Sequence, residues 1–270
     1  MKPSLRSAGP KINFVGEHLP ANRIKQRWEI GQPAIVAWLQ IPSANHAELL
    51  ATLGFDGLVV DLQHSLIDFR TAVEMLTAIE GRGCEPLVRV SQNEYTEVGR
   101  LLDAGASGII APLIDTSEAA QALVDAFHYP PRGSRSLGPR RPVLRWGQDY
   151  RNRTHDLLVS LAMVESRAAL ENLEAILAVP GLDGVFIGPS DLALALGRDP
   201  AADPTDAVVF DAIRQVRESA HAAGKRIGIF CGSAESARER IHEGFDLVSI
   251  GTDLQMLAST AIAGLRHFSE

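Results

Sequence analysis

The amino-acid sequence predicts an α/β protein of the (β/α)8, or TIM-barrel, class. Eight short apolar runs alternate strictly with eight segments of helical periodicity. The apolar runs are nearly unbroken, as is typical of parallel strands that helices cover on both faces. A length of 270 residues, of which 46% are hydrophobic, suits one barrel with a large core.

The expected elements follow one another in regular order. The first strand, AIVAWLQ, is followed by Ser43, a favourable N-cap for the next helix, and Gly54 marks the end of that helix. Asp68 and Gly105 are an N-cap and a C-terminal stop of later helices. Strands are expected at 34–40, 57–62, 86–90, 108–113, 157–165, 184–188, 226–231 and 246–251. Helices are expected at 44–53, 69–81, 94–104, 116–127, 168–178, 206–223, 234–243 and 253–267.

Two segments fall outside this alternation. Residues 1–21 lack periodicity, so we expect an N-terminal extension, with residues 22–270 forming a single barrel domain. Residues 128–156 contain seven arginines, with prolines and glycines that exclude one long helix. We expect this segment to be a loop over the barrel mouth with a short helix inside it. The alternative fold is an open doubly wound sheet, but QIPSAN stands where its Gly-rich phosphate loop would follow the first strand.

The composition excludes several classes of function. The formal charge is −7, with acidic and basic residues mixed along the chain, so no nucleic-acid partner is expected. No apolar run is long enough for a membrane span, and the N-terminus lacks the apolar stretch of a signal peptide. Cys84 and Cys231 have the spacing of neither a zinc site nor a disulfide framework. We therefore expect a protein of the reduced cytoplasm.

Polar residues gather at the ends of the expected strands, which is where TIM barrels carry their active sites. Asp61 and His64 follow the second strand, and Arg89 lies in the third. Glu165 ends the fifth strand, and the sixth leads into Gly188-Pro189-Ser190-Asp191. Because a glycine or an asparagine would suffice to end a strand, this concentration of polar groups predicts a functional site.

Glu165 and Asp191 are the strongest candidate metal ligands. They follow consecutive strands, and two close carboxylates repel one another unless one is protonated or a cation lies between them. Mg²⁺ is often held by one or two carboxylates and leaves positions for water or substrate, so that it can act as a Lewis acid on a carbonyl. The structural alternative is that either carboxylate pairs with an arginine, or that Asp191 caps a helix beginning at Leu192.

Arg89 and His64 each have a functional and a structural interpretation. Arg89 stands in the apolar run LVRVS, where arginine is rare unless it is paired. It either forms an ion pair inside the barrel, with Asp61 as a candidate partner, or presents its guanidinium to a carboxylate or an enolate oxygen. His64 is either structural or a general base, since free histidine side chains titrate near neutrality.

Five groups of motifs occur in order from Asn22 to the C-terminus. They are GFDGLVVDLQHS, LVRV with LLDAGASGIIAPLIDTSEAA, YPPRGSRSLG, MVESRAALENLEAILAVPGLDGVFIGPSDLALALG, and DLVSIGTD. With these motifs the chain resembles the HpcH/HpaI family of metal-dependent 4-hydroxy-2-oxoheptanedioate aldolases. The stretch at 163–197 is the most specific part of the resemblance.

The resemblance implies a TIM barrel with the activity of a class II aldolase, a carbon–carbon lyase that makes or cleaves 4-hydroxy-2-oxo acids through a pyruvate-type or hydroxypyruvate-type enolate and an aldehyde. It implies a divalent cation, Mg²⁺, Mn²⁺ or Co²⁺, on Glu165 and Asp191. It also implies a homo-hexamer whose last helix is exchanged between subunits. The other implied roles are enolate stabilisation by Arg89, proton transfer by His64 with Asp103 paired behind it, support of the cluster by Asp61, and binding of the substrate carboxylate by Gly188, Pro189 and Ser190.

Three positions depart from the family pattern. Met163 stands where members commonly have a glutamine, Leu62-Gln63 replaces a Gly-Glu pair, and Gly57 replaces an aromatic residue, which would open space near the second strand. These departures leave open the acceptor aldehyde and the choice between pyruvate and hydroxypyruvate. Two other functions also stay open. One is an acyl-CoA lyase of the citrate or malyl-CoA type, with the arginine-rich segment 132–153 as its basic site, and the other is a barrel that binds a 2-oxo acid without turnover.

Overall fold

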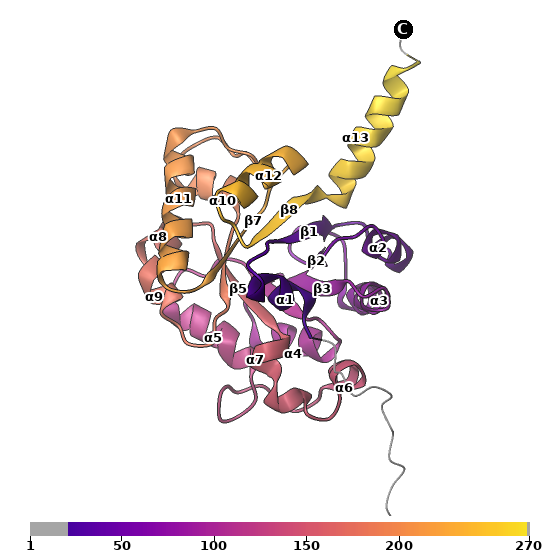
Figure 1. Cartoon of the computed structure of the whole chain (residues 1–270), viewed down its shortest axis with the longest axis vertical. Coiled ribbons are helices and arrows are strands. Elements are labelled where there is room, and N and C mark those ends of the chain that lie inside the picture. Colours follow the sequence, from indigo (N-terminus) through magenta and orange to yellow (C-terminus); the bar gives the residue numbers. More distant parts are fainter. Residues whose placement is uncertain (1–20, 269–270) are drawn as a thin grey trace, which may run out of the picture.

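The predicted barrel is confirmed in a computed structural model of the protein, which describes residues 21–268. Eight parallel strands follow one another in sequence order around the barrel, and β1 pairs with β8 to close it. Helices alternate with the strands on the outside (Figure 1). Residues 1–20, which are nearly all of the expected N-terminal extension, and residues 269–270 lie outside the described residues.

All eight strands lie within two residues of their predicted bounds. They are β1 (Ala34–Leu39), β2 (Gly57–Asp61), β3 (Glu85–Arg89), β4 (Gly108–Ala111), β5 (Val159–Val164), β6 (Gly184–Ile187), β7 (Arg226–Ile229) and β8 (Leu247–Thr252). The helices between them are α2 (Ala44–Ala51), α3 (Phe69–Glu80), α4 (Tyr95–Asp103), α5 (Ser117–Phe127), α8 (Arg167–Glu171), α9 (Leu173–Leu177), α10 (Pro189–Ala195), α11 (Ala207–Ala222) and α12 (Ala234–His242), and α13 (Asp253–Arg266) ends the series.

The predicted helix boundaries have the expected local causes. The Ser43 side chain accepts a hydrogen bond from the His46 main-chain N–H, and Asp68 does the same for its own helix. Gly54 and Gly105 have φ angles of 100° and 107°, which favour glycine and end α2 and α4. The prediction differs at 168–178, where α8 and α9 are separate helices.

Helix α10, which follows β6, was not among the expected helices, and it begins before Leu192, the start that the structural alternative for Asp191 assumed. It starts at Pro189, since proline is favoured at a first helical position, and Gly188 is the N-cap. Asp191 therefore lies in the first turn of α10 rather than at its cap, which contradicts the structural alternative of a helix beginning at Leu192. Its carboxylate makes no capping hydrogen bond.

The long connection at 128–156 contains the expected short helices but not in the expected place. It forms α6 (Arg140–Trp146), the 3-10 helix η1 (Tyr150–Asn152) and α7 (Thr154–Leu157). Arg141 pairs with Glu80 and Arg145 with Glu85, both at 2.8 Å. These two acids lie at the end of α3 and the start of β3, so the segment covers the end of the barrel where strands begin. The prediction that it covers the barrel mouth is wrong, because a connection from a helix to the next strand runs at the opposite end.

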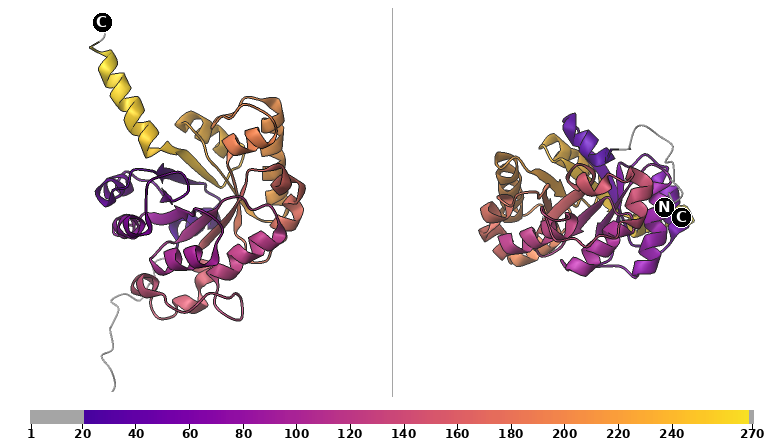
Figure 2. Two further views of the ribbon diagram at one scale, coloured as in Figure 1. Left: turned by 180° about the vertical axis from the view of Figure 1, so that it is seen from behind. Right: turned by 90° about the horizontal axis from the view of Figure 1, so that it is seen from below.

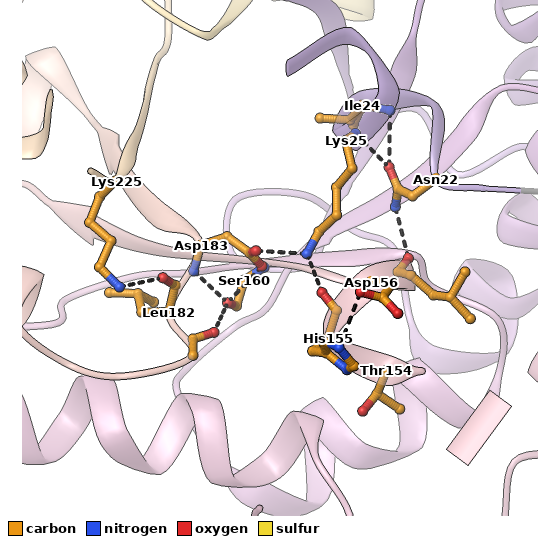
Figure 3. A network of polar contacts seen from close by, with 12 residues as sticks. Asn22, Ile24, Lys25, Thr154, His155, Asp156, Ser160, Leu182, Asp183 and Lys225 are labelled. Atoms are coloured by element: carbon orange, nitrogen blue, oxygen red, sulfur yellow. Dashed lines mark hydrogen bonds and ion pairs between the residues drawn. The ribbon is translucent and has the colours of Figure 1, made fainter. Parts of the chain in front are cut away.

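The same end of the barrel is closed by a helix that the sequence did not reveal, α1 (Arg23–Glu29). Asn22 caps it and also donates from Nδ2 to two buried main-chain carbonyls. The ammonium group of Lys25 lies between the His155 carbonyl and the Asp183 carboxylate, at 2.6 and 2.7 Å (Figure 3). With this end sealed, access to the barrel interior is from the carboxyl ends of the strands.

The last helix, α13, projects away from the barrel in both side views (Figures 1 and 2). Leu254, Leu257 and Ile262 on this helix are 48%, 59% and 52% exposed. Exposed apolar side chains on a projecting helix are typical of a surface that another chain covers. The predicted exchange of this helix between subunits stays a prediction.

One buried histidine should make stability depend on pH. His128 is buried beside Thr154, with 2.8 Å between Nδ1 and Oγ1, and burial lowers the pKa of its imidazole from the ordinary 6.5. The imidazole of the unfolded chain therefore binds a proton at a higher pH than that of the folded chain. The free energy of unfolding then decreases as the pH falls below about 6.5 towards the folded-state pKa. Urea-unfolding midpoints between pH 7.5 and 5 should fall less in a His128→Gln variant than in the wild type. The exposed His267→Gln variant is the control, and parallel curves for His128→Gln and the wild type would contradict the assignment.

Candidate active site

A cavity of about 200 Å³ opens at the carboxyl ends of the strands. Its lining combines apolar and aromatic side chains with polar and charged ones. The cavity is large enough for a small organic acid but not for a drug-sized ligand. The lining residues are Trp38, Gln40, His64, Arg89, Met163, Phe186, Gly188, Pro189, Ser190, Asp191, Phe230 and Thr252.

Arg89 and Asp61 form a buried two-point ion pair beside this cavity. Arg89 Nε and Nη2 donate to the two Asp61 oxygens at 2.9 and 2.7 Å, and the two residues are register partners on adjacent strands. Burial alone would raise the pKa of Asp61, but the hydrogen bonds and charge of Arg89 outweigh it, and the pKa is lowered. The guanidinium also lies 4.4 Å from the ring centroid of Trp38. The structural interpretation of Arg89 is thus confirmed.

The ion pair leaves part of Arg89 available for a ligand. Nη1 makes no hydrogen bond to any of the residues 21–268, and Arg89 lines the cavity. A guanidinium held on one edge by a carboxylate presents its remaining donors in a fixed direction. The structural and functional interpretations are therefore compatible.

His64 follows Asp61 on a tight turn and reaches the cavity from it. The Asp61 carboxylate accepts hydrogen bonds from the main-chain N–H groups of Gln63 and His64 at 3.1 and 3.2 Å. The His64 imidazole is exposed, lines the cavity and has no hydrogen-bond or ion-pair partner within the described chain. A free imidazole at a cavity wall can exchange protons with a ligand.

Glu165 is almost fully buried at the end of β5, with 4% of its surface exposed. Its Oε1 accepts a hydrogen bond of 2.8 Å from the Leu113 N–H, and Leu113 has a φ of 53°, which is unusual for a leucine. Burial raises the pKa of Glu165, and the negative charge of Asp191 raises it further. The glycine at 188 permits close approach, because a Cβ there would lie 2.8 Å from Glu165 Oε2. Gly188 thus lets the start of α10, which carries Asp191, lie against Glu165, and the two carboxylates repel one another.

The chemistry of these two carboxylates fits a divalent cation. Neither forms an ion pair with a basic side chain of residues 21–268. Two close carboxylates without a basic partner favour binding of a cation. Within the same residues no group of three or more His, Cys, Asp or Glu side chains could hold a metal. A site formed by Glu165 and Asp191 would therefore offer a cation two carboxylates and leave its other coordination positions to water and substrate. Mg²⁺ is often bound in this way.

Asp103 does not join the site within the chain. It is the last residue of α4, and its Oδ1 accepts a hydrogen bond of 2.6 Å from Nη2 of the buried Arg135. No hydrogen bond or ion pair connects it to His64 among the described residues. The expected pairing behind His64 does not form within the chain, because α4 carries Asp103 away from the strand ends.

The three departures from the family pattern have different positions. Met163 is 2% exposed and lines the cavity, so it makes part of the wall apolar. Gly57, by contrast, lies at the start of β2, where an added Cβ would meet Glu85 O and Ile24 Cδ1 at 3.1 and 3.2 Å. The expectation that Gly57 opens space near the second strand is therefore wrong. Leu62 packs partly buried against the outer core.

Sequence reasoning missed two lining residues at the end of the first strand. Gln40 follows β1 directly and donates to Asp61, and Trp38 stacks on Arg89. The strand-end rule that identified Asp61 could have found Gln40. Nothing in the sequence distinguishes Trp38 from an ordinary core aromatic residue.

Comparisons with known proteins agree with this architecture. The chain is 53% identical over 240 residues to a hydroxypyruvate/pyruvate aldolase of Rhizorhabdus wittichii, covering 89% of this chain and 96% of the relative. It is 36% identical over 253 residues to a 4-hydroxy-2-oxo-heptane-1,7-dioate aldolase of Klebsiella pneumoniae, covering 92% and 94%. A solved HpcH/HpaI aldolase/citrate lyase family protein from Burkholderia cenocepacia has a TM-score of 0.84 at 31% identity, covering 92% of this chain and all of that one.

The family model of the HpcH/HpaI aldolase/citrate lyase family matches residues 34–260, which is most of the chain. The match confirms the predicted resemblance and, at the level of the family, the predicted lyase activity of the aldolase type. Its bounds also coincide closely with the barrel, from β1 into α13. The chain belongs to the HpcH/HpaI aldolase/citrate lyase family.

Proposed function

We propose that the protein is a divalent-metal-dependent aldolase that forms and cleaves 4-hydroxy-2-oxo acids, with pyruvate or hydroxypyruvate as the 2-oxo acid. The observation that carries the proposal is a cavity lined by Asp191, by an arginine with a free Nη1 and by an exposed histidine, with the buried Glu165 carboxylate near enough to Asp191 to feel its charge. The aldolase relatives, one of them 53% identical to this chain, support the same reaction.

The roles follow from the charges of the cavity. Glu165 and Asp191 would hold Mg²⁺, Mn²⁺ or Co²⁺, which supplies Lewis-acid polarisation of the 2-oxo group when bound. Arg89 Nη1 would donate to the same oxygen as negative charge develops on it. The Gly188-Pro189-Ser190 segment lines the cavity and would bind the substrate carboxylate. Anionic substrates suit a site that contains a guanidinium and a cation.

His64 would move the proton. In the cleavage direction His64 would accept the proton of the C4 hydroxyl group. The C3–C4 bond then breaks, and the electron pair of that bond forms the enolate of the 2-oxo acid. The aldehyde leaves, and the protonated His64 returns the proton to C3 of the enolate, so that the imidazole is neutral again. Asp61 supports this step by holding the His64 main chain and Arg89 together.

The substrate test is a panel of aldehydes offered with pyruvate or hydroxypyruvate in the presence of Mg²⁺, Mn²⁺ or Co²⁺. We expect metal-dependent formation of 4-hydroxy-2-oxo acids with at least one aldehyde. Use of both 2-oxo acids is expected, as the name of the Rhizorhabdus relative states for that protein. Undiminished activity after complete chelation would contradict the proposal.

The acyl-CoA lyase alternative is not favoured by the chain itself. Its only candidate basic site was 132–153, and arginines of that segment are bonded to Asp103, Glu80 and Glu85 at the closed end of the barrel. Direct cleavage of citryl-CoA or malyl-CoA would revive it. The non-catalytic alternative predicts binding of a 2-oxo acid with no exchange of its C3 protons, which proton NMR in D₂O measures.

Assembly and location are parts of the same proposal. We propose a homo-oligomer, a hexamer by resemblance, in which the exposed apolar face of α13 is covered by another subunit. Sedimentation of the full chain tests this. Among residues 21–268 no helix is long and apolar enough to cross a membrane. We also propose a reduced, cytoplasmic environment; Cys84 and Cys231 are both free and buried.

Replacing His64 by alanine should slow turnover by at least about a hundredfold, as removal of a general base usually does. Steady-state kcat for cleavage and the C3 proton exchange of pyruvate should fall together. His155→Ala, at an exposed position on the closed end of the barrel, is the matched control. A variant that retains full proton exchange would show that another group is the base.

A further inference from the structure

The residue that follows β1 makes two contacts at the cavity. Gln40 Nε2 donates to Asp61 Oδ2 at 3.0 Å and to the main-chain oxygen of His64 at 3.3 Å. Within residues 21–268 it is the one side chain that donates both to the Asp61 carboxylate and to the main chain of His64. It therefore connects the ion pair of Asp61 with the turn that carries His64.

The main chain of His64 is held at both of its polar groups. The His64 N–H donates to Asp61 Oδ1 at 3.2 Å, and the His64 carbonyl accepts from Gln40. The imidazole has no bond of its own to the described residues. Its position is therefore determined through the main chain, and Gln40 makes one of the two hydrogen bonds of the His64 main chain.

Gln40 is itself held in place. Its main-chain N–H donates to Asp253 Oδ1 at 2.9 Å, and the next N–H, of Ile41, donates to Oδ2 at 3.1 Å. Asp253 is the first residue of α13 and its side chain is fully buried. The orientation of the Gln40 amide is also determined, because an ionised Asp61 can only accept, so Nε2 must face it. Both hydrogens of Nε2 are then used.

We propose that Gln40 is a positioning residue for proton transfer, which fixes the His64 turn against the Asp61–Arg89 pair. The chemistry of this proposal rests on the proposed aldolase function, and the positioning rests on the contacts of Gln40. Loss of the amide donor leaves the His64 carbonyl without its partner and removes one donor from Asp61. The turn then samples positions from which the imidazole does not reach the reacting proton.

The test compares Gln40→Leu and Gln40→Glu with the wild type. Both variants keep the approximate shape of the side chain, but neither can donate from Nε2. We expect kcat for cleavage to fall roughly tenfold in each, as expected for a lost hydrogen bond to a charged group, with KM changing less than about twofold. Backbone hydrogen exchange of residues 61–65 should be faster in Gln40→Leu. The matched control is Gln121→Leu, which removes a 2.9 Å bond to Asp125 on the surface of α5.

The outcomes separate this proposal from the aldolase function. An unchanged kcat, or unchanged exchange of residues 61–65, in Gln40→Leu overturns the positioning role. Full activity of Gln40→Glu at alkaline pH, where both carboxylates are ionised and neither can donate, also overturns it, because shape would then suffice. If the wild type has no aldolase activity, the proposed function fails, and hydrogen exchange of residues 61–65 alone tests the positioning role. Faster exchange in Gln40→Leu than in Gln121→Leu supports that role, and equal exchange in the two variants refutes it.

Discussion

Replacing Glu165 by glutamine should lower kcat/KM for cleavage by about 10⁴-fold and abolish stabilisation by Mn²⁺ or Mg²⁺. The glutamine oxygen still accepts from the Leu113 N–H, so the local structure is kept, but one of the two carboxylates is lost. Loss of Lewis-acid assistance costs several kcal/mol of transition-state stabilisation, and about 5 kcal/mol corresponds to a factor near 10⁴. Thermal unfolding with and without metal measures the binding independently of activity.

The metal-free forms provide a further check. Burial raises the pKa of Glu165, so ionised Glu165 destabilises the metal-free fold at neutral pH, and Glu165→Gln should be at least as stable as the chelated wild type. Metal should raise the unfolding temperature of the wild type by several degrees, because it binds the folded state. Glu171→Gln, at an exposed position on α8, is the matched control and should respond to metal fully. A Glu165→Gln variant that is still stabilised by metal would place the site elsewhere.

Replacing Asp61 by alanine should cost about 3–5 kcal/mol of unfolding free energy. The substitution leaves the Arg89 guanidinium, whose side chain is 11% exposed, without its only carboxylate partner in residues 21–268. A buried charge that has lost its partner is strongly destabilising, whereas removal of both charges is often tolerated. Activity should also be lost, since His64 and Arg89 both depend on Asp61. Urea denaturation gives the free energy.

The double variant Asp61→Ala with Arg89→Met separates stability from catalysis. It should recover most of the lost unfolding free energy but none of the activity, because the guanidinium is gone. The exposed pair Arg70–Glu74 is the control, and Glu74→Ala there should cost no more than about 0.5 kcal/mol. A cost below about 1 kcal/mol for Asp61→Ala would mean that Arg89 finds another partner.

Much of the fold could be predicted from local patterns. Strands such as β2 and β5 are buried on both faces, so each is an apolar run bounded by polar residues, and Ser43 and Asp68 cap helices through contacts three residues away. Helix α1 was missed because only two of its seven residues are buried, too few to give a clear period. The division between α8 and α9 likewise has no strong local signal.

The residues of the candidate site that could be predicted are those at or near the carboxyl end of a strand. Asp61, Arg89 and Glu165 could be assigned to one face of the barrel because parallel strands all end at the same face. The pairing of Asp103 with Arg135 could not be predicted, because it joins residues 32 positions apart through the path of a long connection. That Gly57 opens no space could not be predicted for a related reason, since the atoms packed against it belong to Glu85 and Ile24 at the closed end of the barrel.

The sequence by itself determined the barrel, the order of its strands and the residues that its carboxyl-terminal face would carry. These follow from hydrophobic periodicity and from the polar groups that end each apolar run. Only the tertiary structure decided which edge of Arg89 is free, that Gln40 connects Asp61 with His64, and that the arginine-rich segment lies away from the cavity. Those features depend on register and on contacts between distant parts of the chain, which local patterns do not specify.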